Sequence, residues 1–196
     1  MAFLPKDYKE PDTSNYMKLE KGDNVFRVLS DAITGMEYWK EADGKRKPVR
    51  LHSEEEIKIG DLETDEKGNL VMPKHFWAFI VFNRAAEKIQ ILEITQKTIR
   101  RQVNALYNNE KWGDPKGYDI TITREGDGFE TEYTVMPNPK EELDEGIVKL
   151  HKDMRINLDA LYEGEDPFSA SEGQKDEEPK SKNKAGNKVD PEDVPF

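Results

Sequence analysis

The sequence predicts a mainly β domain with two helices and a disordered acidic tail. Five short segments have the alternating or continuously apolar patterns of strands, and two longer segments repeat apolar residues at helical spacing. Residues 169–188 contain no Val, Leu, Ile, Met or aromatic residue, and only 35% of the chain is hydrophobic. Because a fully packed chain of 196 residues would be richer in apolar side chains, part of it is expected to be unstructured.

The N-terminal third contains one clear strand pattern. Residues 1–21 are mixed in character and interrupted by prolines, so we expect a loose arm there. In residues 24–31 apolar side chains alternate between two faces, which predicts the first strand, and residues 35–40 are expected to extend it after a glycine bend. Residues 41–74 hold three glycines, many acids and a basic run, which together indicate a long insertion with room for a short hairpin.

The middle of the chain carries the strongest strand pattern. Residues 75–83 are apolar on both faces and rich in aromatic residues, and a short turn leads from them into residues 88–95. These two segments predict the first hairpin. A helix is then expected from Thr95, a favourable N-cap residue, to about Asn109, because apolar residues recur on one face of that stretch.

A second hairpin and a second helix follow. Residues 118–125 and 129–137 alternate cleanly around a Gly-Asp-Gly sequence, which predicts two antiparallel strands joined by a tight turn. Residues 140–162 carry one apolar stripe at helical spacing, with Gly164 just beyond its end, which predicts the second helix.

This order of elements is that of the OB-fold. Its five strands form a Greek-key barrel with a helix between strands 3 and 4. The predicted organisation is an N-terminal arm, an OB-fold domain over residues 22–163 that contains the insertion and the additional C-terminal helix, and a disordered acidic tail over residues 164–196. A small α+β sandwich is the alternative that the same pattern allows.

Charge and composition exclude several classes of protein. The net charge of −11 disfavours nucleic-acid binding, but residues 165–196 hold nine acids and five bases, so −4 belongs to the tail and −7 to the rest. The absence of cysteine excludes disulfides, zinc-thiolate sites and iron-sulfur clusters. No apolar run approaches the roughly 20 residues of a membrane span or the core of a signal peptide, so we expect a soluble protein that is not exported.

No catalytic arrangement is recognisable. The three histidines are isolated in the sequence, and there is no phosphate-binding loop, dinucleotide fingerprint or calcium-binding loop. The glycine-rich residues 125–128 join two alternating segments, so a hairpin turn explains them better than a phosphate cradle does. We therefore expect no enzymatic activity, no metal and no cofactor.

Aromatic and basic residues are interleaved in the way that single-stranded nucleic acid requires. Such binding needs cations that follow the phosphates and aromatic faces on which bases stack. In an OB-fold the face of strands 2 and 3 and the flanking loops form the groove, and many of these residues fall there. The candidate binding residues are Arg27, Tyr38, Trp39, Lys45, Arg46, Lys47, Arg50, Lys74, Trp77, Phe79, Arg84, Lys88, Arg124 and Tyr133.

A structural role is the competing interpretation of these residues. Aromatic side chains on strands usually belong to a core, and Trp77 and Phe79 lie on a segment that is apolar on both faces. The basic run 45–50 is equally compatible with a solvated turn.

The chain resembles the single-stranded-DNA-binding proteins of bacteriophages. The resemblance lies in GDNVFRVLSDAITGMEYW, IQILEIT and KWGDPKGYDITITREGDGFETEYTV, and it covers about residues 20–140. It implies an OB-fold core and sequence-non-specific binding of single strands in DNA replication, recombination or repair, in the cytoplasm of the infected bacterial host. Some phage relatives carry a zinc site, but a chain without cysteine cannot share a thiolate-ligated one.

The terminal DPEDVPF resembles the acidic, Pro-Phe-ended tip of bacterial single-stranded-DNA-binding proteins. Here Val replaces their usual Ile, and three acids supply the charge. The resemblance implies a tail that recruits replication or recombination enzymes such as a polymerase, helicase, primase or nuclease, and that competes with DNA for the cationic groove. The implied partner-binding residues are Asp190, Glu192, Asp193, Val194, Pro195 and Phe196.

A second hypothesis comes from another class of function. The overall charge of −11 would also suit an acidic interaction protein, or a nucleic-acid mimic that docks on host DNA-processing enzymes without binding DNA. The apolar stripe of residues 140–162 suits packing on the barrel or pairing with another copy, so a monomer and a homodimer both remain open.

Overall fold

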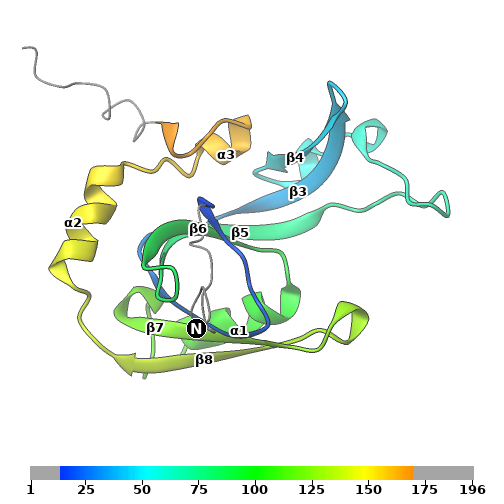
Figure 1. Cartoon of the computed structure of the whole chain (residues 1–196). Coiled ribbons are helices and arrows are strands. Elements are labelled where there is room, and N and C mark those ends of the chain that lie inside the picture. Colours follow the sequence, from blue (N-terminus) through cyan, green and yellow to red (C-terminus); the bar gives the residue numbers. More distant parts are fainter. Residues whose placement is uncertain (1–13, 170–196) are drawn as a thin grey trace, which may run out of the picture.

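The computed structural model describes residues 14–169, and this part of the chain is a mainly β structure with a few helices (Figure 1). The prediction of a mainly β domain with helices is confirmed. Eight strands are present in these residues where the sequence predicted five, because the N-terminal arm and the insertion each contribute one strand. Residues 35–40, which were expected to extend the first strand, instead belong to a separate strand. The strands are β1 (Tyr16–Met17), β2 (Gly22–Val28), β3 (Ile33–Ala42), β4 (Lys45–Leu51), β5 (Lys74–Asn83), β6 (Lys88–Ile94), β7 (Tyr118–Glu125) and β8 (Glu132–Lys140).

Strand β5 organises the sheet. One edge of β5 pairs antiparallel with β6, and the other pairs first with β3, over residues 74–78, and then with β2, over residues 81–83. The strand order is β1-β6-β5-β2-β7-β8, with β3 and β4 branching from β5. The sheet does not close, because within the described residues β8 pairs only with β7. This order is consistent with a barrel-like OB-fold.

The apolar character of β5 on both faces follows from two separate cores. Phe79 and Val81 point into the first core, under helix α1 (Lys97–Tyr107). Phe76 and Ile80 point to the opposite face, into the second core, which the C-terminal residues cover. Each fully buried side chain of this size contributes about 1.5–3 kcal/mol, so both faces hold the strand in place.

Helix α1 lies beside the open edge of the sheet. It follows β6 and precedes β7, and Ile99 and Val103 are the side chains that it buries in the first core. The Gln102 side chain donates to the Tyr133 carbonyl at 3.0 Å and accepts from the Val135 amide at 2.9 Å. The helix thereby satisfies two backbone groups of β8 that no strand pairs with.

The second core is completed by residues 156–168, which we call the C-terminal cover. Leu158, Leu161 and Phe168 are buried against β5 and β6. Tyr162 donates from its hydroxyl to the Thr34 carbonyl at 2.8 Å, and its ring stacks on His52 with centroids 3.8 Å apart. Because Phe168 belongs to a core, the folded part extends beyond residue 163, where the sequence predicted the tail to begin.

The continuous helix expected over residues 140–162 is wrong. Strand β8 runs to Lys140, and the helical part is divided into α2 (Glu145–Met154) and α3 (Ala160–Glu163). The chain leaves α2 at Arg155, which has a left-handed conformation with φ of 49°. The predicted apolar stripe still packs on the second core, because Ile147 and Met154 contact it from α2.

The expected insertion contains more regular structure than the sequence indicated. A long β3–β4 hairpin begins at Ile33, before the insertion, and ends at Leu51. Two short 3₁₀ turns, Glu54–Glu56 and Ile59–Asp61, then precede β5. Among the helices of residues 14–169, none combines the length and the apolar character that crossing a membrane requires.

Candidate nucleic-acid interface

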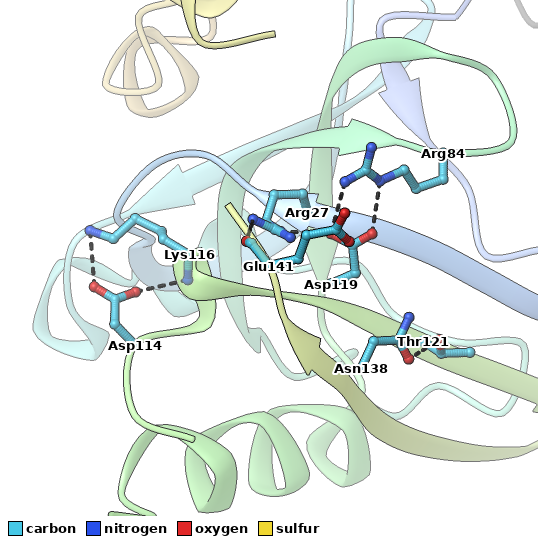
Figure 2. Close-up of polar contacts among 8 residues, drawn as sticks. All are labelled: Arg27, Arg84, Asp114, Lys116, Asp119, Thr121, Asn138 and Glu141. Carbon is cyan, nitrogen blue, oxygen red and sulfur yellow. Dashed lines mark hydrogen bonds and ion pairs between the residues drawn. The ribbon is translucent and has the colours of Figure 1, made fainter. Parts of the chain in front are cut away.

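Two of the predicted DNA-binding arginines hold β2, β5 and β7 together instead. Figure 2 shows Arg27 and Arg84 converging on one carboxylate, that of Asp119. Nε of Arg27 donates to Oδ1 at 2.6 Å, and Nε of Arg84 donates to Oδ2 at 2.8 Å. Nη1 of Arg27 also donates to the Glu141 carbonyl at 2.9 Å. Arg27 is 1% exposed, so the prediction that it contacts DNA is wrong.

The electrostatics of this centre support a structural role. Burial would raise the pKa of Asp119, but the hydrogen bonds from Arg84 and Arg27 outweigh it and hold that pKa below its ordinary value. The carboxylate is therefore ionised and saturated with charged donors. Arg84 is one-third exposed, and its guanidinium also lies over the Phe82 ring at 5.3 Å.

Arg50 is likewise held inside the fold. Its Nη2 lies 2.6 Å from Oε2 of Glu93 and 3.1 Å from Oε2 of Glu37, and its side chain is only 10% exposed. Burial raises the pKa of Glu37 to about 8, and the hydrogen bond with Glu93 and its charge add to this effect. Glu37 is thus largely protonated at neutral pH, which leaves Arg50 and Glu93 as the charged pair.

The aromatic candidates on the central strands belong to the cores. Phe79 is 4% exposed inside the first core, and Tyr38 is 7% exposed on β3, so neither offers a face on which a base could stack. Trp77 and Tyr133 are half-buried and pack against the first core. The predictions for Phe79 and Tyr38 are wrong because burial in the sheet excludes a ligand.

Three further basic candidates are placed at the edges of the sheet. Arg124 donates from Nη1 to the Leu19 carbonyl at 3.0 Å, and Lys88 donates from Nζ to the Ser14 carbonyl at 2.9 Å. Both interactions tie down the N-terminal end of the described chain. Lys74 is exposed at the start of β5.

The remaining candidates gather on the end of the β3–β4 hairpin. Pairing of β3 with β5 ends at Glu37, so residues 38–49 extend beyond the body of the sheet; we call them the arm (Figure 1). Trp39 is 42% exposed, and the guanidinium of Arg46 lies over its ring at 5.4 Å from the centroid. Arg46 also pairs with Glu63 at 2.8 Å, which fixes it above the ring.

The arm has an aromatic face and a lysine face. Trp39 is opposite Pro48, whereas Lys40 is opposite Lys47, and directly opposed residues share a face. Lys45 and Lys47 are exposed and form no ion pair with any described residue. The arm therefore combines an exposed ring, a cation stacked on it and two available ammonium groups.

A cavity of about 410 Å³ opens beside α1 and is a weaker candidate. Trp77, Tyr107 and Val103 contribute to its apolar wall. The cation at its rim, Lys116, is bound by Asp31 at 2.6 Å and by Asp114 at 3.3 Å. This rim is acidic overall, so it disfavours a phosphate.

Besides Tyr107 on α1, an exposed aromatic residue of the β7–β8 turn lies outside the predicted site. Phe129, in the turn between β7 and β8, is 110% exposed, more than in an extended reference chain. An aromatic residue within a glycine-rich hairpin turn is the sequence signal that could have found it, because a turn that short cannot bury a ring. The predicted partner-binding residues 190–196 lie outside the described residues.

Comparison with known proteins gives one informative match. No family model matches the chain. The chain is 26% identical over 147 residues to a protein of Escherichia phage T5 with the name "Probable ssDNA-binding protein". The match covers 63% of this chain and 55% of the relative, so the chain spans about half the length of that relative.

Proposed function

We propose that this protein binds single-stranded DNA and that the arm is its principal contact. The observation that carries the proposal is the stacked pair of Trp39 and Arg46 at the end of an exposed hairpin, whose opposite face carries Lys45 and Lys47. Base stacking on an exposed ring contributes roughly 1–3 kcal/mol per base and requires no particular sequence. The name of the similar phage T5 protein supports the same ligand.

The fold supports DNA binding, and we propose the arm as the contact in place of the face of strands 2 and 3. We propose that the sheet is an OB-fold barrel in which β5 and β6 are the second and third strands. The face of these strands that usually binds an oligonucleotide is covered here, since Phe76 and Ile91 are fully buried under the C-terminal cover. The loop between the first two barrel strands, which contains the arm, then remains as the exposed part of the groove.

The expected binding is sequence-non-specific and sensitive to salt. The arm offers contacts to bases through a ring and to phosphates through ammonium groups, and neither reads a base edge. The residues before the tail carry −7, so a local cationic surface must act within a negative protein. Affinity is then expected to fall steeply as salt rises, with little binding of duplex.

The proposed biological role rests on single-stranded DNA as the ligand. We infer a non-enzymatic protein that protects single strands during phage DNA replication, recombination or repair in the cytoplasm of the infected bacterium. Residues 190–196 are proposed to recruit partner enzymes and to compete with DNA for the arm, because they place three acids beside an apolar ring.

A fluorescence titration with a dT oligomer tests the proposal. Single strands should quench the intrinsic tryptophan emission, the quenching should weaken with salt, and Trp39→Phe should remove most of it while Trp77 and Trp112 still emit. Trp112→Phe is the matched control, because that ring packs on Tyr118 at the first core. Absence of binding at low salt would exclude this function and favour an acidic interaction protein.

A further inference from the structure

We propose that the β7–β8 turn of one copy docks on the arm of a second copy and occupies it when DNA is absent. This inference deepens the proposed function and rests on it for the role of the arm. The turn is defined as residues 125–132 and is called the Phe129 turn. It presents negative charges around one apolar ring, which is the chemistry that a nucleotide also presents to the arm.

Phe129 is held outward by a turn with a defined backbone. A Cβ atom on Gly126 would lie 2.1 Å from the Glu130 carbonyl oxygen, and Gly126 has φ of 72°, so only glycine fits there. The Thr131 hydroxyl donates to the Gly128 carbonyl at 2.8 Å. Lys21 binds the Asp127 carboxylate at 2.8 Å and ties the turn to the start of β2.

The charge of the turn excludes DNA as its natural ligand. Its eight residues include four acids and no base, and all four acids are exposed: Glu125, Asp127, Glu130 and Glu132. Phosphates would be repelled from this surface. A basic surface with room for a ring would be attracted to it.

The arm has that complementary chemistry. Its residues 38–49 include four bases and two acids, a net charge of +2 against −4 for the turn. Lys45 and Lys47 have no ion pair among the described residues, and on the other face of the arm Trp39 offers an exposed ring to Phe129. Opposite charge steers the two surfaces together, and aromatic contact holds them.

The pairing must join two different molecules. The arm and the Phe129 turn project from the same side of the molecule but at its upper and lower ends (Figure 1). A copy placed above another therefore brings its turn to the arm of the copy below. Since each copy carries both surfaces, the contact can close into a reciprocal pair or repeat along a row of copies.

Charge reversal tests the pairing directly. In sedimentation velocity at low salt, Phe129→Ala should weaken self-association of the full chain about tenfold, and Glu130→Lys with Glu132→Lys should weaken it further. Lys45→Glu with Lys47→Glu should have the same effect. Mixing the two charge-reversed proteins should restore association, because each then supplies the partner that the other lost. Met136→Ala, at an exposed residue of β8, is the control and should change nothing.

Cross-linking tests whether the arm of one copy contacts the Phe129 turn of another. The chain has no cysteine, so Lys47→Cys and Glu130→Cys can be prepared separately without background. Oxidation should link the two variants only when they are mixed, and a dT oligomer should suppress the link. Efficient linking of Glu130→Cys to itself, or association that persists at saturating dT, would overturn the proposal.

The two proposals fail in different ways. If the protein binds dT but the Phe129 and charge-reversed variants associate like the original, the docking inference fails alone. If the protein shows no DNA binding while mixing still restores association, the proposed function fails. The two surfaces then still pair, but their pairing does not control access of DNA to the arm.

Discussion

The guanidinium of Arg46 lies over the indole of Trp39, 5.4 Å from the ring centroid, at the exposed end of the β3–β4 hairpin. The pair joins residues seven positions apart in sequence through the pairing of two strands. Glu63 pairs with Arg46 at 2.8 Å and so helps to hold the cation above the ring. This geometry holds a cation and a ring together as one surface, the one that we propose for a base and its phosphate.

Loss of the ring should weaken DNA binding without affecting the fold. Trp39→Ala is expected to reduce affinity for a dT oligomer by about 1–3 kcal/mol, the value of one stacked base. Fluorescence anisotropy of a labelled oligomer measures the change. The affinity of Trp39→Phe should lie between those of the original protein and Trp39→Ala. Equal affinities for all three proteins would show that no base stacks on the arm.

Replacing the buried arginine should instead unfold the protein. Arg27→Met leaves Asp119 with Arg84 alone and is expected to cost about 3 kcal/mol of unfolding free energy. Urea denaturation followed by circular dichroism measures it, with the exposed Arg101→Ala as control. At urea concentrations where the variant is folded, its affinity for DNA should match that of the original protein.

The centre around Asp119 should also make the fold sensitive to acid. Its folded pKa lies below its ordinary value, so its stabilising contribution is present above that ordinary value. The contribution is lost as pH falls through the lowered folded pKa. Urea midpoints between pH 5 and pH 2 should fall less steeply for Asp119→Asn than for the original protein.

Glu37 should give the opposite dependence on pH. Its folded pKa of about 8 exceeds its ordinary value of 4.5, so the folded state favours the protonated carboxyl. The stabilisation is complete below the ordinary value and is lost as pH rises through 8, by up to about 1.4 kcal/mol per pH unit. Glu37→Gln keeps the neutral form, so urea midpoints from pH 5 to pH 9 should fall less than in the original, whereas the exposed Glu132→Gln should not differ from it.

Two truncations should separate the C-terminal cover from the tail. Removing residues 164–196 deletes Phe168 from the second core and should cost about 3–5 kcal/mol, as a Phe→Ala change does. Removing only residues 190–196 should leave the melting temperature unchanged, strengthen dT binding and abolish capture of partner enzymes. If the shorter deletion alters neither binding nor capture, the proposed role of the tail is wrong.

The sequence by itself located four of the strands. Alternation of apolar residues located β5, β6, β7 and most of β8, because a period of two and a period of 3.6 are set locally by backbone geometry. It also located the arm, since Trp39 and the basic run 45–47 stand close together in the chain. These features depend on neighbours in sequence, and a pattern can therefore reveal them.

Only the tertiary structure decided which side chains remain available. Arg27 and Arg50 look like surface cations in the sequence, yet carboxylates 92 and 43 residues away along the chain bind them. The apolar second face of β5 could have been a stacking platform or a core, and the C-terminal cover made it a core. Partners this distant in sequence are brought together by folding, so no local pattern records whether a charged or aromatic residue meets solvent or another part of the chain.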